Sequence, residues 1–287
     1  MIPEVLMILS LNAYAKINLY LDVHEKRPDG YHDLVSIMQQ VSLHDIVSVR
    51  RLDSGIVITC TDPAIPTDER NIAHKCARAF FDYFKLNGGA EIHIEKKISA
   101  AAGLAGGSTD GAAVLTLLNR LYGTGADAET LCEIGAKIGA DVPFCIMGGT
   151  CICEGIGEIL TPVVLPKKNY RILIAFPGNG VSTAEAFRAL DCTPSDSAGH
   201  SPEDVLEPLK SGSVPEKLYN SFERAILPVH PAAVRVKRIL LENGAVTAMM
   251  SGSGPSVFGL FDTEESRIHA ENALKQAGFD VYPCEPV

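Results

Sequence analysis

The chain has 287 residues, of which 46% are hydrophobic and 21% are charged, and its formal net charge is −10 at pH 7. This composition is typical of a globular protein with a large core and argues against an intrinsically disordered chain. The acidic balance argues against a nucleic-acid partner, because such binding needs clustered Lys and Arg residues. The length favours two lobes over one.

Hydrophobic periodicity predicts alternating strands and helices in the first half of the chain. Strands are expected at residues 6–23, 35–49, 56–60 and 90–94, and helices at 71–84 and 128–138. A small-residue stretch at 101–113 precedes apolar residues at helical spacing, which predicts a loop and then a helix. A further strand is expected at 144–153.

The second half continues with shorter elements. Residues 191–217 are rich in Pro, Ser, Asp and Gly, and we expect an exposed connection or short helices there. Strands are expected at 172–176, 247–250 and 256–261, helices at 231–243 and 264–277, and an edge strand at 281–282. Because no apolar run approaches the roughly 18 residues of a membrane-spanning helix, we expect no membrane partner and a cytoplasmic protein.

The eight cysteines lack the paired spacing of a zinc site or of a secreted disulfide framework. Cys151 and Cys153 would face the same side of a strand and could bind a metal. Core packing is the favoured interpretation, because free cysteine is among the most buried residue types. We therefore expect reduced, mostly buried thiols.

The Gly/Ala-rich loop before the predicted helix has the composition of a phosphate-binding loop. Gly103, Gly106 and Gly107 would let backbone N–H groups approach a phosphate closely, and residues 108–110 lie where the helix should begin. A helix N-terminus carries unpaired N–H donors and a partial positive charge, so this order predicts an anion site. The alternative is a tight turn with Ser108 as the N-cap. Neither the Walker nor the Rossmann fingerprint is present.

Two ionisable residues stand out from their apolar surroundings. Alternation places Tyr14, Lys16 and Asn18 on one face of the first strand, although a solvated lysine is the commoner case for such a position. Asp141 follows a predicted helix and precedes an apolar run. It is either an N-cap or turn residue, or a carboxylate retained for chemistry, and the residues alone leave both possibilities open.

Taken in order, these motifs resemble those of the GHMP kinases. The segments that carry the resemblance are AKINLYLDV, RPDGYHDL, GLAGGSTD, GADVPF and SGSGPSVF, which together span residues 12–261. The first two are similar, more narrowly, to the diphosphocytidyl-methylerythritol kinases. The resemblance implies an α+β, two-lobed GHMP kinase fold, with a ribosomal-protein-S5-domain-2-like ATP-binding domain at 1–160 and a ferredoxin-like domain at 161–287.

By this resemblance the protein is an ATP-dependent kinase that phosphorylates the 2-hydroxyl of a small molecule bearing a cytidine diphosphate group, in the non-mevalonate isoprenoid pathway. Lys16 and Asp141 would form the catalytic pair, with Asp141 taking or orienting the proton of the hydroxyl. The residues implied to contact the substrate are Asn18, Tyr31, His32, Asp141 and Phe187.

The resemblance also implies how ATP is held. Asn71 and Lys96 would contact its base and phosphates, and Mg²⁺ would bridge the β- and γ-phosphates without a metal site fixed by the protein alone. The loop implied to wrap the phosphates consists of Ala102, Gly103, Leu104, Ala105, Gly106, Gly107, Ser108 and Thr109. A second loop, implied to support the active site, consists of Ser251, Gly252, Ser253 and Gly254.

Two positions of the phosphate loop depart from the family pattern. Ala105 stands where the family usually has glycine, and it should keep the turn if its φ is negative. Asp110 stands where the family usually has asparagine, and its carboxylate should repel phosphates unless Mg²⁺ or a neighbouring lysine intervenes. The alternatives to the implied activity are a mevalonate or homoserine type of GHMP kinase and a non-catalytic nucleotide sensor. We expect a monomer or a weak homodimer.

Overall fold

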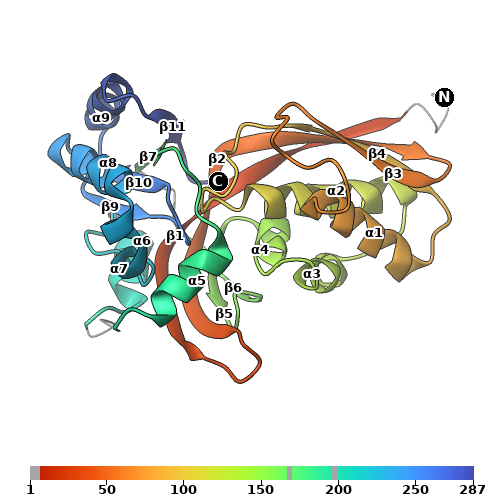
Figure 1. Ribbon diagram of the computed structural model, residues 1–287, viewed down its shortest axis with the longest axis horizontal. Coiled ribbons are helices and arrows are strands. Elements are labelled where there is room, and N and C mark those ends of the chain that lie inside the picture. The colour runs from red at the N-terminus through yellow and green to blue at the C-terminus, as the bar shows by residue number, and fades with distance from the viewer. Residues whose placement is uncertain (1–6, 167–169, 195–198) are drawn as a thin grey trace. The chain divides into compact units, whose positions relative to one another are not determined.

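The computed structural model describes residues 7–166, 170–194 and 199–287 (Figure 1). Its described residues form two compact units. The first unit contains residues 7–15, 44–100 and 105–148, and the second contains the described residues of 16–43, 101–104 and 149–287. Two long strands, β1 (Ile8–Lys26) and β2 (His32–Leu52), contribute residues to both units.

The sheet of the first unit is built on the C-terminal part of β2. This part pairs antiparallel with β4 (Gly89–Glu95), which pairs parallel with β3 (Gly55–Cys60). The strand predicted at 35–49 is confirmed, and Val47 and Val49 are fully buried while Ser48 between them is only partly covered. The buried side chains face the helices of the unit.

Four helices cover one face of this sheet, as Figure 1 shows. They are α1 (Ile72–Phe84), α2 (Gly106–Tyr122), α3 (Ala128–Ala136) and α4 (Val142–Met147). Helices α1 and α2 lie side by side, and Phe80 of α1 and Leu115 of α2 are fully buried with Ile92 of β4. Helix α1 begins after the N-cap Asn71, whose side chain accepts a hydrogen bond from the backbone of Ala73.

The strand predicted at 144–153 is wrong in its first half. Residues Val142–Met147 form helix α4, and only Thr150–Glu154 form a strand, β5. Pro143 lies in the first turn of α4, where its fixed φ and missing N–H are tolerated. Gly148 has a φ of 70° and ends the helix. A short apolar run does not distinguish a buried helix from a strand by periodicity, which explains the error.

In the second unit, the C-terminal part of β1 and the N-terminal part of β2 pair with other strands. Residues of β2 pair antiparallel with β5, which pairs with β6 (Ile159–Pro162), and β1 pairs parallel with β8 (Tyr219–Asn220). Cys151 and Cys153 of β5 are both buried, as core packing predicts.

A separate four-stranded antiparallel sheet completes the second unit, in the order β11-β7-β10-β9. Its strands are β7 (Arg171–Phe176), β9 (Thr247–Met250), β10 (Val257–Phe261) and β11 (Asp280–Cys284). The helices are α5 (Thr183–Asp191), α6 (Glu203–Ser211), α7 (Glu223–Ile226), the 3-10 helix η2 (Leu227–Val229), α8 (Pro231–Glu242) and α9 (Glu264–Gln276). The elements predicted after residue 230 are all confirmed, with β11 at the edge.

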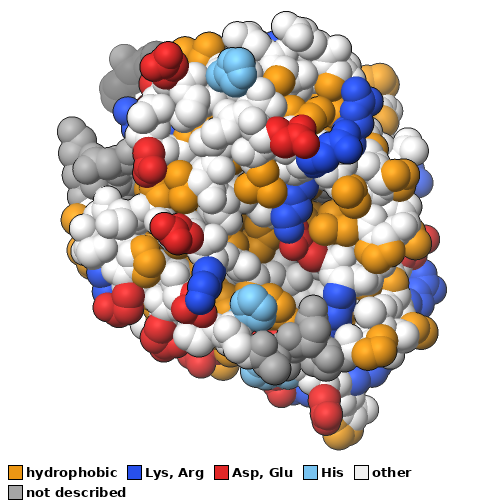
Figure 2. Space-filling view, turned by 90° about the vertical axis from the view of Figure 1, so that its left-hand side faces the viewer, with side chains coloured by type: hydrophobic (Ala, Val, Ile, Leu, Met, Phe, Trp, Pro, Cys, Tyr) orange, Lys and Arg blue, Asp and Glu red, His pale blue; other side chains and the backbone are white. Residues whose placement is uncertain are grey.

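The segment 191–217 contains the short helix α6, so the expectation of short helices there is confirmed. Residues 195–198 of this segment lie outside the described residues. Among the described residues, no helix combines the length and apolarity needed to cross a membrane. On the face drawn in Figure 2, Lys and Arg side chains lie singly or in small groups among acidic and apolar ones.

Candidate active site

The phosphate loop enters α2 through a left-handed backbone turn. Ala105, the residue before the first helical residue, has a φ of 58°. The condition of a negative φ at Ala105 is therefore not met. A left-handed backbone conformation costs an L-residue roughly 1–2 kcal/mol. Alanine, which has the smallest side chain after glycine, tolerates the turn that the loop requires.

The first part of this loop is bound to the predicted supporting loop within the second unit. Ser251 Oγ donates to the carbonyl of Gly103 at 3.0 Å, and the Ser256 N–H donates to the carbonyl of Ala102 at 3.2 Å. A Cβ atom at Gly103 would lie 2.1 Å from the Ser251 carbonyl oxygen, and Gly103 has a φ of 78°. Only glycine therefore fits at this crossing.

Asn220, which the sequence analysis did not identify, holds the supporting loop from the other side. Its side-chain amide donates to the carbonyls of Met250 at 2.7 Å and Gly252 at 2.9 Å. Ser253 Oγ lies 3.2 Å from Thr183 Oγ1. Asn220 is buried, and no periodicity in the sequence singles it out.

Lys16 and Asn18 lie beside these two loops. Lys16 Nζ donates to Asn18 Oδ1 at 2.8 Å, and Asn18 Nδ2 donates to Ser36 Oγ at 2.8 Å. The Lys16 N–H donates to the carbonyl of Leu104 at 3.2 Å, and a Cβ at Gly252 would lie 3.3 Å from Lys16 Nζ. Lys16 is only 4% exposed, so it is not the solvated strand residue that the sequence left open.

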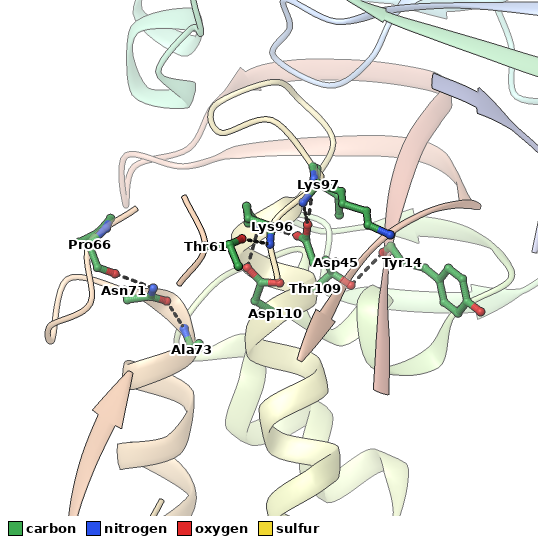
Figure 3. Close-up of polar contacts among 11 residues, drawn as sticks. Tyr14, Asp45, Thr61, Pro66, Asn71, Ala73, Lys96, Lys97, Thr109 and Asp110 are labelled. Atoms are coloured by element: carbon green, nitrogen blue, oxygen red, sulfur yellow. Dashed lines mark hydrogen bonds and ion pairs between the residues drawn. The ribbon is translucent and has the colours of Figure 1, made fainter. Parts of the chain in front are cut away.

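In the first unit, the start of α2 combines open backbone with close packing. A Cβ at Gly106 would lie 3.0 Å from Ile98 Cγ2 and 3.1 Å from Lys96 Nζ. Thr109 Oγ1 donates to the carbonyl of Tyr14 at 2.8 Å (Figure 3). Ser108 is half-buried in the first turn. The first N–H groups of such a helix have no intrahelical acceptor and are suited to bind an anion.

A buried ion cluster lies against this helix start. Lys96 Nζ contacts Asp110 Oδ2 at 2.7 Å and Asp45 Oδ2 at 2.5 Å, and Asp45 Oδ1 also accepts the backbone N–H groups of Lys97 and Ile98 (Figure 3). A neighbouring lysine thus compensates the unexpected carboxylate at 110. Asp45 shares a strand face with the buried Val47 and Val49, and this alternation was the signal that could have identified it.

The charged groups of this cluster shift one another's pKa values. Burial raises the pKa of Asp110 to about 7, with Lys96 acting against the rise and Asp45 adding to it. Burial would lower the pKa of Lys96, but the two carboxylates outweigh it and hold that pKa above its usual value. Asp110 Oδ1 is buried without a hydrogen-bond partner among the described residues.

Asn71 and Asp141 both occupy helix N-caps of the first unit. Asn71 Oδ1 accepts from the Ala73 N–H at 2.8 Å and its Nδ2 donates to the Pro66 carbonyl at 2.7 Å (Figure 3). Asp141 is half-buried at the start of α4. Asp141 belongs to the first unit and Lys16 to the second, so their action as a pair stays a prediction.

The residues predicted to bind cytidine include one stacked pair. The rings of His32 and Phe187 stack with centroids 5.0 Å apart, and Phe187 also packs edge-on against Phe222. His32 Nε2 lies 2.7 Å from Asp191 Oδ1. Tyr31 is 60% exposed in the turn before β2.

Asp191, at the end of α5, was missed because a lone carboxylate at a helix end has no distinguishing pattern. Its other oxygen contacts Lys26 Nζ at 3.2 Å. Burial acts to raise the pKa of Asp191, but hydrogen bonds from His32 and Lys26 outweigh it and lower that pKa. An ionised carboxylate only accepts hydrogen bonds, so His32 Nε2 carries a proton and donates it.

Comparisons with known proteins identify the family of the chain. Residues 71–149 match the family described as GHMP kinases N terminal domain, and residues 202–280 match GHMP kinases C terminal. A 4-diphosphocytidyl-2-C-methyl-D-erythritol kinase of Clostridium perfringens is 44% identical over 88% of this chain and 89% of its own length.

Two solved structures are also similar. A crystal structure of 4-(cytidine 5'-diphospho)-2C-methyl-D-erythritol kinase has a TM-score of 0.81 and 33% identity, covering 96% of this chain and 98% of its own. A homoserine kinase from Cytophaga hutchinsonii has a TM-score of 0.74 at 20% identity, covering 100% and 96%, which shows the fold alone. The predicted GHMP kinase fold is confirmed, and the chain belongs to the GHMP kinases and, among them, to the 4-diphosphocytidyl-2-C-methyl-D-erythritol kinase family.

Proposed function

We propose that this protein uses ATP to phosphorylate the 2-hydroxyl of 4-diphosphocytidyl-2-C-methyl-D-erythritol, a step of the non-mevalonate isoprenoid pathway. The observation that carries the proposal is the 44% identity, over 88% of the chain, to a kinase of that name. Two features of the structure support it. The glycine-rich turn before α2 suits the phosphates of ATP, and the stacked pair of His32 and Phe187 suits the cytidine group.

The first unit is proposed to hold the phosphates of ATP at the start of α2. Gly106 and Gly107 leave backbone N–H groups accessible, and the helix end favours negative charge. Ser108 and Thr109 add hydroxyl groups in the same turn, and Asn71 is proposed to lie near the base. Mg²⁺, when bound to the β- and γ-phosphates, neutralises charge that develops during transfer.

Phosphoryl transfer requires positioning and charge stabilisation more than covalent chemistry. Asp141 is proposed to accept or orient the proton of the 2-hydroxyl, and Lys16 to stabilise the negative charge of the reacting oxygens. Asn18 holds the Lys16 ammonium through the 2.8 Å hydrogen bond to its Oδ1. The Ser251–Gly254 turn, which Asn220 holds at Gly252, is proposed to support the same region through the contact of Ser251 with Gly103.

The cytidine end is proposed to bind at the His32 ring. Phe187 supports the face of that ring, and Tyr31 supplies a second aromatic side chain. Asp191 fixes Nε2, which leaves Nδ1 to hydrogen-bond the base. We also propose that residues 1–160 and 161–287 are the two domains, and that the protein is a cytoplasmic monomer or weak homodimer.

The deciding experiment is ADP release by the purified protein with Mg-ATP and, in turn, 4-diphosphocytidyl-2-C-methyl-D-erythritol, mevalonate and homoserine. We expect turnover with the first substrate only. Turnover with one of the others would keep the kinase activity but refute the cytidine site at His32. Nucleotide binding without turnover of any substrate would favour a sensor.

The proposed role of Asp141 has its own test. Asp141→Asn should lower kcat by about 100-fold or more with a small change in KM, the size expected when a general base is lost. Steady-state kinetics with both substrates measure this. A kcat close to that of the wild type would refute the assignment of Asp141.

A further inference from the structure

The Lys96 ammonium lies in an electrostatically unfavourable place. A Cβ at Gly106, the first residue of α2, would lie only 3.1 Å from Lys96 Nζ, so the ammonium packs against the helix start. The N-terminus of a helix carries a partial positive charge and repels cations. The Lys96 side chain is 4% exposed, and water therefore compensates little of this repulsion.

Two carboxylates offset the unfavourable charge. Asp45 and Asp110 contact Nζ at 2.5 Å and 2.7 Å, and their side chains are 0% and 3% exposed. An ammonium has three N–H groups, and these two contacts use two of them. In Figure 3 the three side chains converge from β2, from the segment after β4 and from α2.

We propose that Asp45 and Asp110 are positioning residues for ATP, because they hold the Lys96 ammonium beside Gly106 with its third N–H directed to an anion at the start of α2. This inference rests on the proposed function, in which that anion is the ATP phosphate chain. Gly106 has a second role here, since a side chain at this position would displace the ammonium.

The two carboxylates differ in how firmly they are held. Asp45 Oδ1 accepts the backbone N–H groups of Lys97 and Ile98 at 2.5 Å and 2.8 Å, so Asp45 fixes the segment that carries Lys96. Asp110 Oδ1 has no hydrogen-bond partner among the described residues. Asp45 therefore anchors the segment that carries Lys96, whereas the negative charge of Asp110 would repel the phosphates.

This asymmetry gives two isosteric substitutions opposite effects. In Asp45→Asn, the amide oxygen keeps the two backbone N–H groups, which turns the amide NH₂ toward the Lys96 ammonium and displaces it. In Asp110→Asn, the amide oxygen can keep Lys96 while the NH₂ takes the place of Oδ1. The second change keeps the cation in place and removes a negative charge near the phosphates.

The experiment compares the full-length wild type with Asp45→Asn, Asp110→Asn and Asp110→Ala at pH 8, measuring kcat, both KM values, the Kd for Mg-ADP and Tm. We expect Asp45→Asn to raise the KM for ATP and the Kd for Mg-ADP about 10-fold, the size of one lost charge-assisted hydrogen bond. Asp110→Asn should lower both about 3-fold, and Asp110→Ala should raise both. The KM for the second substrate should change less than about 2-fold.

A purely structural role would produce a different pattern. Equal shifts in Asp45→Asn and Asp110→Asn, or a lower Tm with unchanged nucleotide constants, would overturn the inference. If Asp45→Asn does not fold, the opposite signs expected for Asp110→Ala and Asp110→Asn still decide it. Mg-ADP binding is independent of the phosphoryl acceptor, so a wild type that binds Mg-ADP but phosphorylates no cytidine substrate would refute the proposed function alone.

Discussion

The protein contains two clusters in which a carboxylate faces a basic side chain, and they differ in their access to water. Around Lys96, the three charged side chains are 4% exposed or less. Around His32, the imidazole is 6% exposed, but Asp191 is 31% and Lys26 is 54% exposed. Water has little access to the charges of the Lys96 cluster, whereas it can hydrate Asp191 and Lys26 in the His32 cluster.

Because of this difference, we expect the Lys96 cluster to affect the stability of the fold and the His32 cluster to affect mainly ligand recognition. A buried charge that loses its partner cannot turn to water, so the two carboxylates need Lys96, and Lys96 needs the carboxylates, to stay ionised. A half-exposed carboxylate such as Asp191 can be rehydrated when His32 moves, and it contributes little to folding. The first cluster suits a fixed phosphate site, and the second suits a ring that adjusts to a ligand.

The largest expected effect is the removal of the buried cation. Lys96→Met leaves Asp45 and Asp110 facing each other without a counter-charge, which should lower the free energy of unfolding by about 3–5 kcal/mol. The matched control is Lys26→Met, which removes the exposed partner of Asp191 and should cost less than about 1 kcal/mol. Urea denaturation at pH 7 measures both, and equal losses would break the comparison.

The second prediction concerns pH. Asp110 binds its proton more tightly in the folded state, with a pKa of about 7 against an ordinary value of 3.8, so stability falls as pH rises between these values. Asp110→Asn removes this titration between Lys96 and Asp45. Its free energy of unfolding should therefore gain on the wild type by about 2–4 kcal/mol from pH 4 to pH 7 and then level off. Parallel curves in urea denaturation would contradict the shift.

The smallest expected effect lies in the exposed cluster. Asp191→Ala removes the acceptor of His32 Nε2 and should raise the KM for the cytidine substrate about 5-fold, with a change in unfolding free energy below about 1 kcal/mol. Asp191→Asn keeps an acceptor oxygen and should restore most of the affinity. Steady-state kinetics decide the matter, and an equal rise in the KM for ATP would mean that Asp191 acts on the fold as a whole.

Much of the fold follows from periodicity in the sequence. Helices α1, α3, α8 and α9 lie close to their predicted positions because each has an apolar stripe and a cap or glycine at its ends. Helix α4 was missed because its six residues are too few for a helical stripe to differ from a buried strand. The Ala105 backbone was also missed, since alanine rarely adopts a positive φ.

Residues of the candidate site were singled out where motifs are local and overlooked where contacts join distant segments. Lys16 with Asn18 and the two glycine-rich loops were identified from short motifs, and their contacts within the second unit are now seen. Asp45 lies 51 residues from Lys96, and Asp191 lies 159 residues from His32. The strand alternation marks Asp45 as buried, but no local pattern shows which base either carboxylate meets, and only the fold brings the partners together.

The crossing of Gly103 over Ser251 affects how a mutational scan of this protein would be interpreted. Every substitution at 103 places a carbon atom 2.1 Å from a carbonyl oxygen, so alanine and aspartate should be equally harmful there. At Lys16 or Asp141, by contrast, tolerance should depend on the chemistry of the replacement. A flat profile of intolerance would thus identify a steric position, and a graded profile a chemical one, without any assay of the reaction itself.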